Sequence, residues 1–429
     1  MSIIVRAILI GPWAISALLF LSACASAPSY HPDMPMPEGD WKARAQSQQA
    51  EGIEVTAAVP SAKEAKELFG MPLYKKGIQP VWLRISNSRD TRVSFLPVGL
   101  DPQYFTPLEV ANTELKDKDV DDPTKVVDEF FLQQGLGALS VEPGETRSGF
   151  IFSKLDEGTK AFNVDIVGAS DNEGIREFDT FTFFIPVPGL NIDHYKVDWR
   201  NLYSDDEWVD VEADRLIEII ENMTCCVTDK KGKGSGDPLN LVVIGRPTDI
   251  YTAFIRAGWD ETETVTRTST LKTIGSFLSG GEYRYSPVSG LYVFDRPQDV
   301  AFQKARENIH ERNHLRLWMS RATFEGEPVF MGQISRDIGV RFTSKTITTH
   351  KIDPDVDETR EYLLENLVYS QALEKFAYVG GVGEVSYENP KGNLTGDPWF
   401  SDGYRLVLWV TSEPVAIDDL KFVEWRRPY

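Results

Sequence analysis

The residues best able to do chemistry lie in three stretches of the second half of the chain. They are His310, His314 and Arg316, then Arg336 and Asp337, and finally His350, Asp353, Asp355 and Asp357. Three of the five histidines of the chain fall in these stretches. Imidazole and carboxylate groups are donors in metal sites that activate water, and guanidinium groups bind phosphate or carboxylate.

Three interpretations follow from these residue types. If the ends of neighbouring strands meet, His314, His350 and Asp353 could hold a divalent metal ion, with Asp337 beside them as a further catalytic candidate. Alternatively, Arg316 and Arg336 could clamp an anionic ligand. In the third interpretation, the same groups form buried His–Asp and Arg–Asp pairs that fix the ends of strands.

The local pattern limits the metal interpretation. His310 and His314 are four residues apart, which is ligand spacing on a helix, whereas alternation around Leu315 predicts a strand. The run that starts at Asp353 imitates a calcium loop, but Glu358 and Leu364 stand where that loop needs glycine and an acidic residue. Nucleophile motifs of the G-x-S-x-G type are missing from the sequence.

The elements that would position these residues form two regions. Alternating apolar residues predict an antiparallel β-sandwich over residues 51–190, with strands at 81–87, 147–152, 160–168 and 180–186. Residues 191–236 are expected to be a helical connector, with one helix running from Ser204, as its cap, to Met223.

A mixed α/β domain is predicted over residues 237–429. Strands are expected at 239–245, 291–294, 314–319, 329–334 and 405–410, and helices at 248–257, 269–278 and 357–372. The strands at 314–319 and 329–334 should form a hairpin around Glu325-Gly326-Glu327. A capping-box-like pair, Asp355 with Glu358, marks the start of the last helix. The fold class is therefore an α+β multidomain protein, in which the sandwich precedes the mixed α/β domain.

Three motifs in the second half resemble a known family. They are Ser286–Asp299 (SPVSGLYVFDRPQD), Arg312–Trp318 (RNHLRLW) and Thr349–Asp357 (THKIDPDVD). These motifs resemble the LssY C-terminal domain family, and the resemblance covers residues 237–425. In some members of that family the domain follows membrane-embedded segments that resemble a lipid phosphatase. The sequence holds no such segments, so the resemblance implies no phosphatase activity and assigns no chemistry to the domain.

The N-terminus predicts a membrane anchor. Residues 1–23 have the charge and apolar core of a signal peptide, and Leu21-Ser22-Ala23-Cys24 resembles the lipobox of bacterial lipoproteins. That resemblance implies diacylglycerol on the Cys24 sulfur, cleavage before Cys24 and acylation of the new amine by a chain such as palmitate. Several acyl chains anchor a protein stably. Ala25 at the next position favours the periplasmic face of the outer membrane, and the proline-rich residues 24–50 read as a tether.

Composition narrows the functions that remain. A formal net charge of −20 disfavours a nucleic-acid partner. We therefore expect a lipid-anchored envelope protein with a binding or assembly role, whose partner is an envelope protein or a ligand. The alternative is a metal-dependent hydrolase that acts on an envelope phosphoester or lipid-linked substrate through His314, Asp337, His350 and Asp353. The missing nucleophile motifs and the failed calcium-loop pattern favour the role that is not enzymatic.

Overall fold

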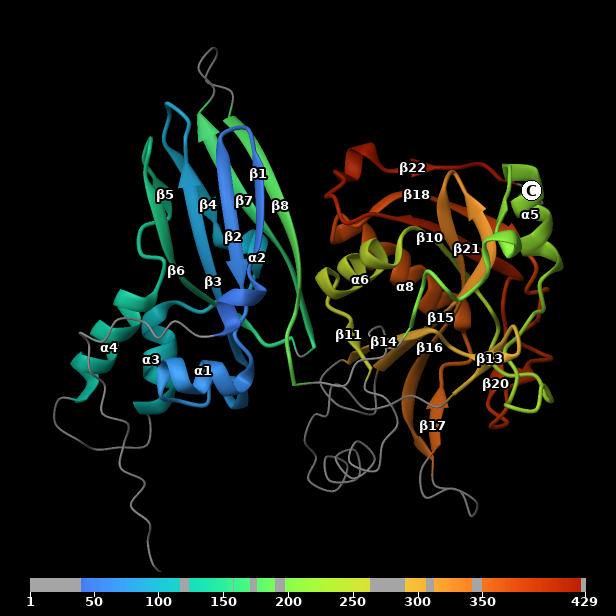
Figure 1. The fold of residues 1–429 in the computed structure, drawn as a ribbon. Coiled ribbons are helices and arrows are strands. Elements are labelled where there is room, and N and C mark those ends of the chain that lie inside the picture. Colours follow the sequence, from blue (N-terminus) through green and yellow to red (C-terminus); the bar gives the residue numbers. More distant parts are fainter. Residues whose placement is uncertain are drawn as a thin grey trace, which may run out of the picture.

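The computed structural model describes residues 40–115, 123–156, 158–169, 176–189, 197–262, 290–305, 312–341 and 349–425 (Figure 1). Cys24 with most of its tether, His310 and the helix expected at 269–278 lie outside these ranges. Within them the chain has the predicted α+β architecture, with antiparallel sheets first and a mixed sheet later. No helix of the described residues is long and apolar enough to cross a membrane.

The first region is an antiparallel sandwich, as predicted, but it begins earlier than expected. Residues 46–50, which the sequence pattern assigns to the tether, form its strand β1 and pair with β2. One sheet has the order β1 (Gln46–Ala50), β2 (Ile53–Ala58), β3 (Ile78–Asn87), β6 (Thr146–Lys154). The other has the order β5 (Ser140–Val141), β4 (Val93–Leu96), β7 (Thr159–Ala169), β8 (Arg176–Pro186). Alternate residues of both sheets, among them Val55, Leu83, Val164 and Phe183, are buried between the two layers. This core is what the period-two pattern requires.

Helices cover the outer face of the first sheet near one end. They are α1 (Ala62–Phe69), α3 (Pro107–Leu115) and α4 (Pro123–Gln134), while α2 (Pro97–Leu100) is a single turn. Phe69, Phe131, Phe150 and Phe152 pack there with ring centroids 5.0–6.4 Å apart. The prolines at 102 and 107 predict only a loop with a helical turn over residues 101–111, so the helical layer is an addition to the predicted sandwich.

The second region is built on a ten-stranded mixed sheet. Its main path is β11 (Asp260–Glu261), β14 (Val300–Ala305), β15 (Arg312–Phe324), β16 (Glu327–Arg341), β10 (Leu241–Ile244), β21 (Tyr404–Val410), β18 (Leu373–Gly380), β22 (Lys421–Phe422). Off this path, β17 (Thr349–Ile352) pairs with β16, and β9 (Val209–Asp210) pairs with β15. Strands β10 and β21 are parallel, whereas β15 and β16 form the expected antiparallel hairpin.

Helices pack on both faces of this sheet (Figure 1). Helices α6 (Pro247–Arg256) and α8 (Val356–Tyr369) lie on one face, and α5 (Ala213–Asn222) lies on the other. We call the sheet with these three helices the C-terminal domain. Smaller hairpins are β12 (Tyr292–Val293) with β13 (Arg296–Pro297) and β19 (Lys391–Gly392) with β20 (Pro398–Trp399), and short 3-10 turns occur at Asp40–Arg44, Leu73–Lys76, Asp205–Glu207 and Ile417–Asp419.

The predicted start of the helix at Ser204 is wrong. Ser204 makes a capping box with Glu207, but it begins only a 3-10 turn, and α5 starts at Ala213. Between them the backbone is extended, because β9 pairs in parallel with Ala322 and Thr323 of β15. Tertiary pairing therefore overrides the helical stripe read from Trp208 and Val211.

The sandwich and the C-terminal domain touch through α6. Phe184 of β8 and Tyr251 of α6 have ring centroids 6.1 Å apart, and the Thr182 hydroxyl donates to the Ser412 carbonyl at 3.3 Å. Figure 1 shows α6 on the side of the C-terminal domain that faces β8. Helix α6 contacts both β7 and β8, and Ser412 from the segment after β21 adds a hydrogen bond, so the two domains meet without sharing a sheet.

Candidate functional site

His314 and Asp337, two of the residues predicted to form a site, are in contact. His314 Nε2 lies 2.7 Å from Asp337 Oδ2, and Arg312 Nε lies 3.7 Å from the same oxygen. The strands β15 and β16 bring these side chains to the sheet face that α5 also covers. All three side chains are buried. The interaction is a buried His–Asp–Arg group of the kind expected under the structural interpretation.

Burial sets the protonation of this group. It lowers the pKa of His314 to about 4, although the Asp337 carboxylate opposes that shift. His314 is therefore neutral at neutral pH. Arg312 and Arg316 lie on the same strand face on either side of it, and their positive charges disfavour a bound cation at this position.

The other predicted metal donors do not join this pair among the described residues. The Asp353 side chain accepts from the Asp355 backbone N–H at 3.1 Å, in the turn that leads into α8. The His350 backbone pairs with Val340, while its side chain lies outside the described residues. The described part of the chain holds no group of three or more His, Cys, Asp or Glu side chains that could bind a metal ion.

Arg316 and Arg336 do not form the predicted clamp. Arg316 lies opposite Gln333, and Arg336 lies opposite Asn313, so the two arginines project from opposite faces of the sheet. Arg316 Nη1 donates to Gln333 Oε1 at 2.8 Å. Arg336 Nη1 donates to Glu358 Oε1 of α8 at 2.9 Å. Each guanidinium therefore bonds to a partner on a different face of the sheet.

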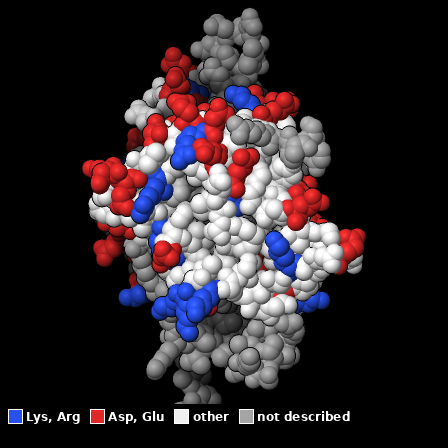
Figure 2. Space-filling view, turned by 90° about the vertical axis from the view of Figure 1, so that its right-hand side faces the viewer, with Lys and Arg blue, Asp and Glu red and all other residues white. Residues whose placement is uncertain are grey.

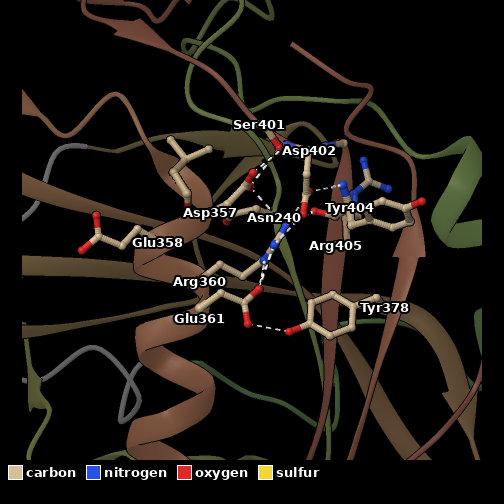
Figure 3. Close-up of polar contacts among 12 residues, drawn as sticks. Asn240, Asp357, Glu358, Arg360, Glu361, Tyr378, Ser401, Asp402, Tyr404 and Arg405 are labelled. Carbon is tan, nitrogen blue, oxygen red and sulfur yellow. Dashed lines mark hydrogen bonds and ion pairs between the residues drawn. The ribbon is translucent and has the colours of Figure 1, made fainter. Parts of the chain in front are cut away.

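A second polar network, which the sequence analysis does not predict, joins α8 to the start of β21 (Figure 3). Arg360 donates to both carboxylate oxygens of Asp402 at 2.9 Å and to Asp357 Oδ1 at 3.1 Å. Glu361 completes it by bonding Arg360 at 2.8 Å and the Tyr378 hydroxyl at 2.5 Å. Burial raises the pKa of Asp357 to about 6, and the Arg360 charge works against that rise. The network attaches the first turns of α8 to the sheet.

Arg405 is the most deeply buried charged residue of this area (Figure 3). It is 0% exposed, and it donates to the backbone carbonyls of Leu239 at 2.8 Å, Thr224 at 2.7 Å and Gly381 at 3.1 Å. A further bond goes to the Ile220 carbonyl near the end of α5. Burial lowers the pKa of Arg405 to about 10. The cation sits at the C-terminal end of α5, where the helix dipole favours positive charge.

A cavity of about 490 Å³ lies between α5 and the sheet. Its apolar lining comes from Leu216, Ile219 and Ile220 of α5 and from Ala322, Val329 and Met331 of β15 and β16. The volume is within the range of small-molecule sites, about 300–1,000 Å³, which are mostly apolar with a few polar groups. The cavity shares a sheet face with His314, but His314 does not line it.

Three arginines add charge to the lining of this cavity: Arg215, Arg296 and Arg321. Each is paired with a carboxylate that does not itself line the cavity: Glu218 at 2.6 Å, Asp299 at 2.8 Å and Glu207 at 2.9 Å. Asp295 contributes one acidic side chain to the lining. The described lining therefore holds more positive than negative groups.

An unfavourable backbone turn shapes one wall of the cavity. Phe294 and Asp295 connect β12 to β13 with φ of 54° and 59°. A two-residue turn of type I′ needs positive φ at both positions, which glycine, asparagine and aspartate adopt most readily, so Phe294 is the unfavourable residue of this pair. The turn puts the Arg296 guanidinium 5.3 Å from the Tyr203 ring centre and 5.4 Å from that of Phe294. Strain of this kind concentrates at functional sites.

Comparison with protein families agrees with the resemblance seen in the sequence. Residues 206–404 match the family model described as the LssY C-terminus, which is just under half of the chain. The matched range includes α5 and both walls of the cavity. No curated protein is similar to the chain. Sequence analysis does not find the cavity, although Phe294, Asp295 and Arg296 stand within a motif that carries the family resemblance.

Proposed function

We propose that this protein is a lipid-anchored lipoprotein of the bacterial envelope, and that its C-terminal domain binds a ligand with an apolar portion in the cavity beside α5. The observation that carries the binding role is the 490 Å³ cavity with its mainly apolar lining. The predicted lipobox at Cys24 supports the anchor, and its position before Ala25 favours the periplasmic face of the outer membrane.

Binding is better supported than hydrolysis. His314 and Asp337 are buried against Arg312, and Asp353 is used in the turn before α8. A general base must reach its substrate within hydrogen-bond distance, directly or through a water molecule. The described groups instead bond to one another inside the domain, so the hydrolase alternative gains no support from them.

The anchor is tested by replacing Cys24 with alanine. We expect the wild-type protein to incorporate a palmitate analogue and to sediment with membranes, because two or more acyl chains give stable attachment. The Cys24→Ala variant should lose the label. The double variant Cys225→Ala, Cys226→Ala is the matched control, because it removes the two other cysteines of the chain, which form a disulfide with each other, and it should keep both properties. Incorporation of the label into Cys24→Ala would disprove the lipoprotein assignment.

The binding role is tested by filling the cavity. Ile219→Trp adds a large side chain from α5 into the space, and we expect it to weaken binding of the neutral apolar dye Nile red at least tenfold. Ile338→Trp is the matched control, because Ile338 is 42% exposed and does not line the cavity. Equal dye binding by the two variants, both folded by circular dichroism, would contradict the proposed site.

A further inference from the structure

We propose that the ligand of this cavity is a single-chain amphiphile with an anionic head group, and that Arg215 and Arg321 bind the head. This inference rests on the proposed function, because it names the chemical class of ligand for the same cavity. It goes further in assigning a charge to the ligand and a binding role to two arginines.

The apolar portion of the ligand is indicated by the lining. Val209 is 51% exposed and Phe294 is 38% exposed in this lining, and Ile219 of α5 is partly exposed, so apolar side chains are open to a ligand there. The flexible Met223 side chain also lines the space, and methionine adapts to chains of differing shape. Helix α5 lies on the side of the molecule that Figure 2 presents, where uncharged side chains cover much of the centre of the face.

The negative charge of the head group is inferred from the charged side chains that line the cavity. Guanidinium groups line the cavity, whereas Glu207, Glu218 and Asp299 pair with them from outside the lining. Within the described lining, three guanidinium groups therefore stand against the single carboxylate of Asp295. Guanidinium groups bind carboxylate and phosphate through two parallel hydrogen bonds, so either head would satisfy the same residues.

The three arginines differ in how easily they can turn to a ligand. Arg296 is held by Asp299, by the Tyr203 hydroxyl at 2.7 Å and by the Met319 carbonyl at 2.6 Å. Arg215 and Arg321 have side chains 60% and 62% exposed. Exposed ion pairs contribute little, so these two can exchange Glu218 and Glu207 for a ligand anion, while Arg296 remains a fixed part of the wall.

The experiment uses residues 25–429, which are the predicted mature chain without its lipidated Cys24, so that no acyl group is present and no detergent is needed. Nile red is displaced by four probes with the same chain: dodecanoate, dodecyl phosphate, dodecanol and dodecyltrimethylammonium. We expect the two anionic probes to act at about tenfold lower concentrations than dodecanol, since each exposed charge contact is worth up to about fivefold in affinity. Shortening the dodecanoate chain should weaken it about fourfold per methylene.

The arginines are tested by the double variant Arg215→Gln with Arg321→Gln. It should remove the advantage of the anionic probes and leave the affinity for dodecanol and Nile red within about twofold. Arg92→Gln is the control, because Arg92 is an exposed, ion-paired arginine of the sandwich, and it should bind all probes like the wild type.

The experiment distinguishes failure of the anionic-ligand inference from failure of the cavity as a binding site. If Nile red binds in the cavity but dodecanol or dodecyltrimethylammonium displaces it as well as dodecanoate does, this inference is overturned and the proposed function stands. An unchanged anionic advantage in the double variant overturns it as well. If Ile219→Trp leaves binding of every probe unchanged, the cavity is not the site, and both proposals fail together.

Discussion

Replacing Arg405 with methionine is expected to lower the free energy of unfolding of the C-terminal domain by about 3–5 kcal/mol. Arg405 is 0% exposed and joins the end of α5, the segment before β10 and the end of β18 through backbone carbonyls. Methionine fills a similar volume without donors. Each buried carbonyl that loses its partner costs about 1–3 kcal/mol, so several such losses outweigh the gain from removing a buried charge.

The measurement is urea unfolding followed by tryptophan fluorescence and by circular dichroism. Arg84→Met is the control, because Arg84 is 44% exposed on the sandwich and pairs with Glu54 at 3.2 Å. Its effect should stay within about 0.5 kcal/mol. A loss below about 1 kcal/mol in Arg405→Met would show that water or neighbouring groups replace the guanidinium.

Acid is expected to destabilise the C-terminal domain through His314, by up to about 3 kcal/mol between pH 6.5 and pH 4. The pKa of His314 is lowered from 6.5 to about 4 in the folded state, mainly because burial disfavours the charged ring. The unfolded chain therefore takes up the proton first. The stabilising contribution is complete above pH 6.5 and is lost as the pH falls towards 4.

The measurement must separate the effect of His314 on stability from that of Asp357, which changes stability with pH in the opposite direction. Asp357 has a folded pKa raised to about 6 from 3.8, so the folded state takes up its proton first, and its contribution grows as the pH falls from about 6 to 3.8. We therefore compare Asp357→Asn with the double variant Asp357→Asn, His314→Gln by urea unfolding across this pH range. The double variant should lose most of the acid dependence. An identical slope in the two proteins would exclude His314 as its source.

Much of the fold can be predicted from the sequence, because many of its strands and helix ends are set by local residue patterns. Alternation marks β7 and β8 of the sandwich, and the pair of strands around residues 314–319 and 329–334 forms the expected hairpin. Asp355 caps α8 as the Asp355–Glu358 pattern predicts, accepting from the backbone N–H groups of residues 357 and 358. The start of α5 is misread, since its preceding residues pair with β15.

The placement of the predicted His, Asp and Arg residues is harder to read, because it depends on the length of the β15–β16 turn and on the shift of register between Met319 and Thr323. Phe324 pairs with Glu327, so the turn contains two residues, Glu325 and Gly326. A three-residue turn through Glu327 would have put Arg316 and Arg336 on one face and separated His314 from Asp337, since a shift of one residue reverses every side chain. Long-range groups such as Arg360 with Asp402 carry no sequence signal beyond their charge.

The position of β21 affects how the chain can be made. Strand β21 begins at Tyr404, lies between β10 and β18, and pairs in parallel with residues 241–244. Two segments far apart in the sequence thus meet in the interior of the sheet, and closing so long a loop is slow. A chain interrupted before this strand would leave two unpaired strand edges. Strands β10 and β18 therefore cannot complete the core of the C-terminal domain without β21.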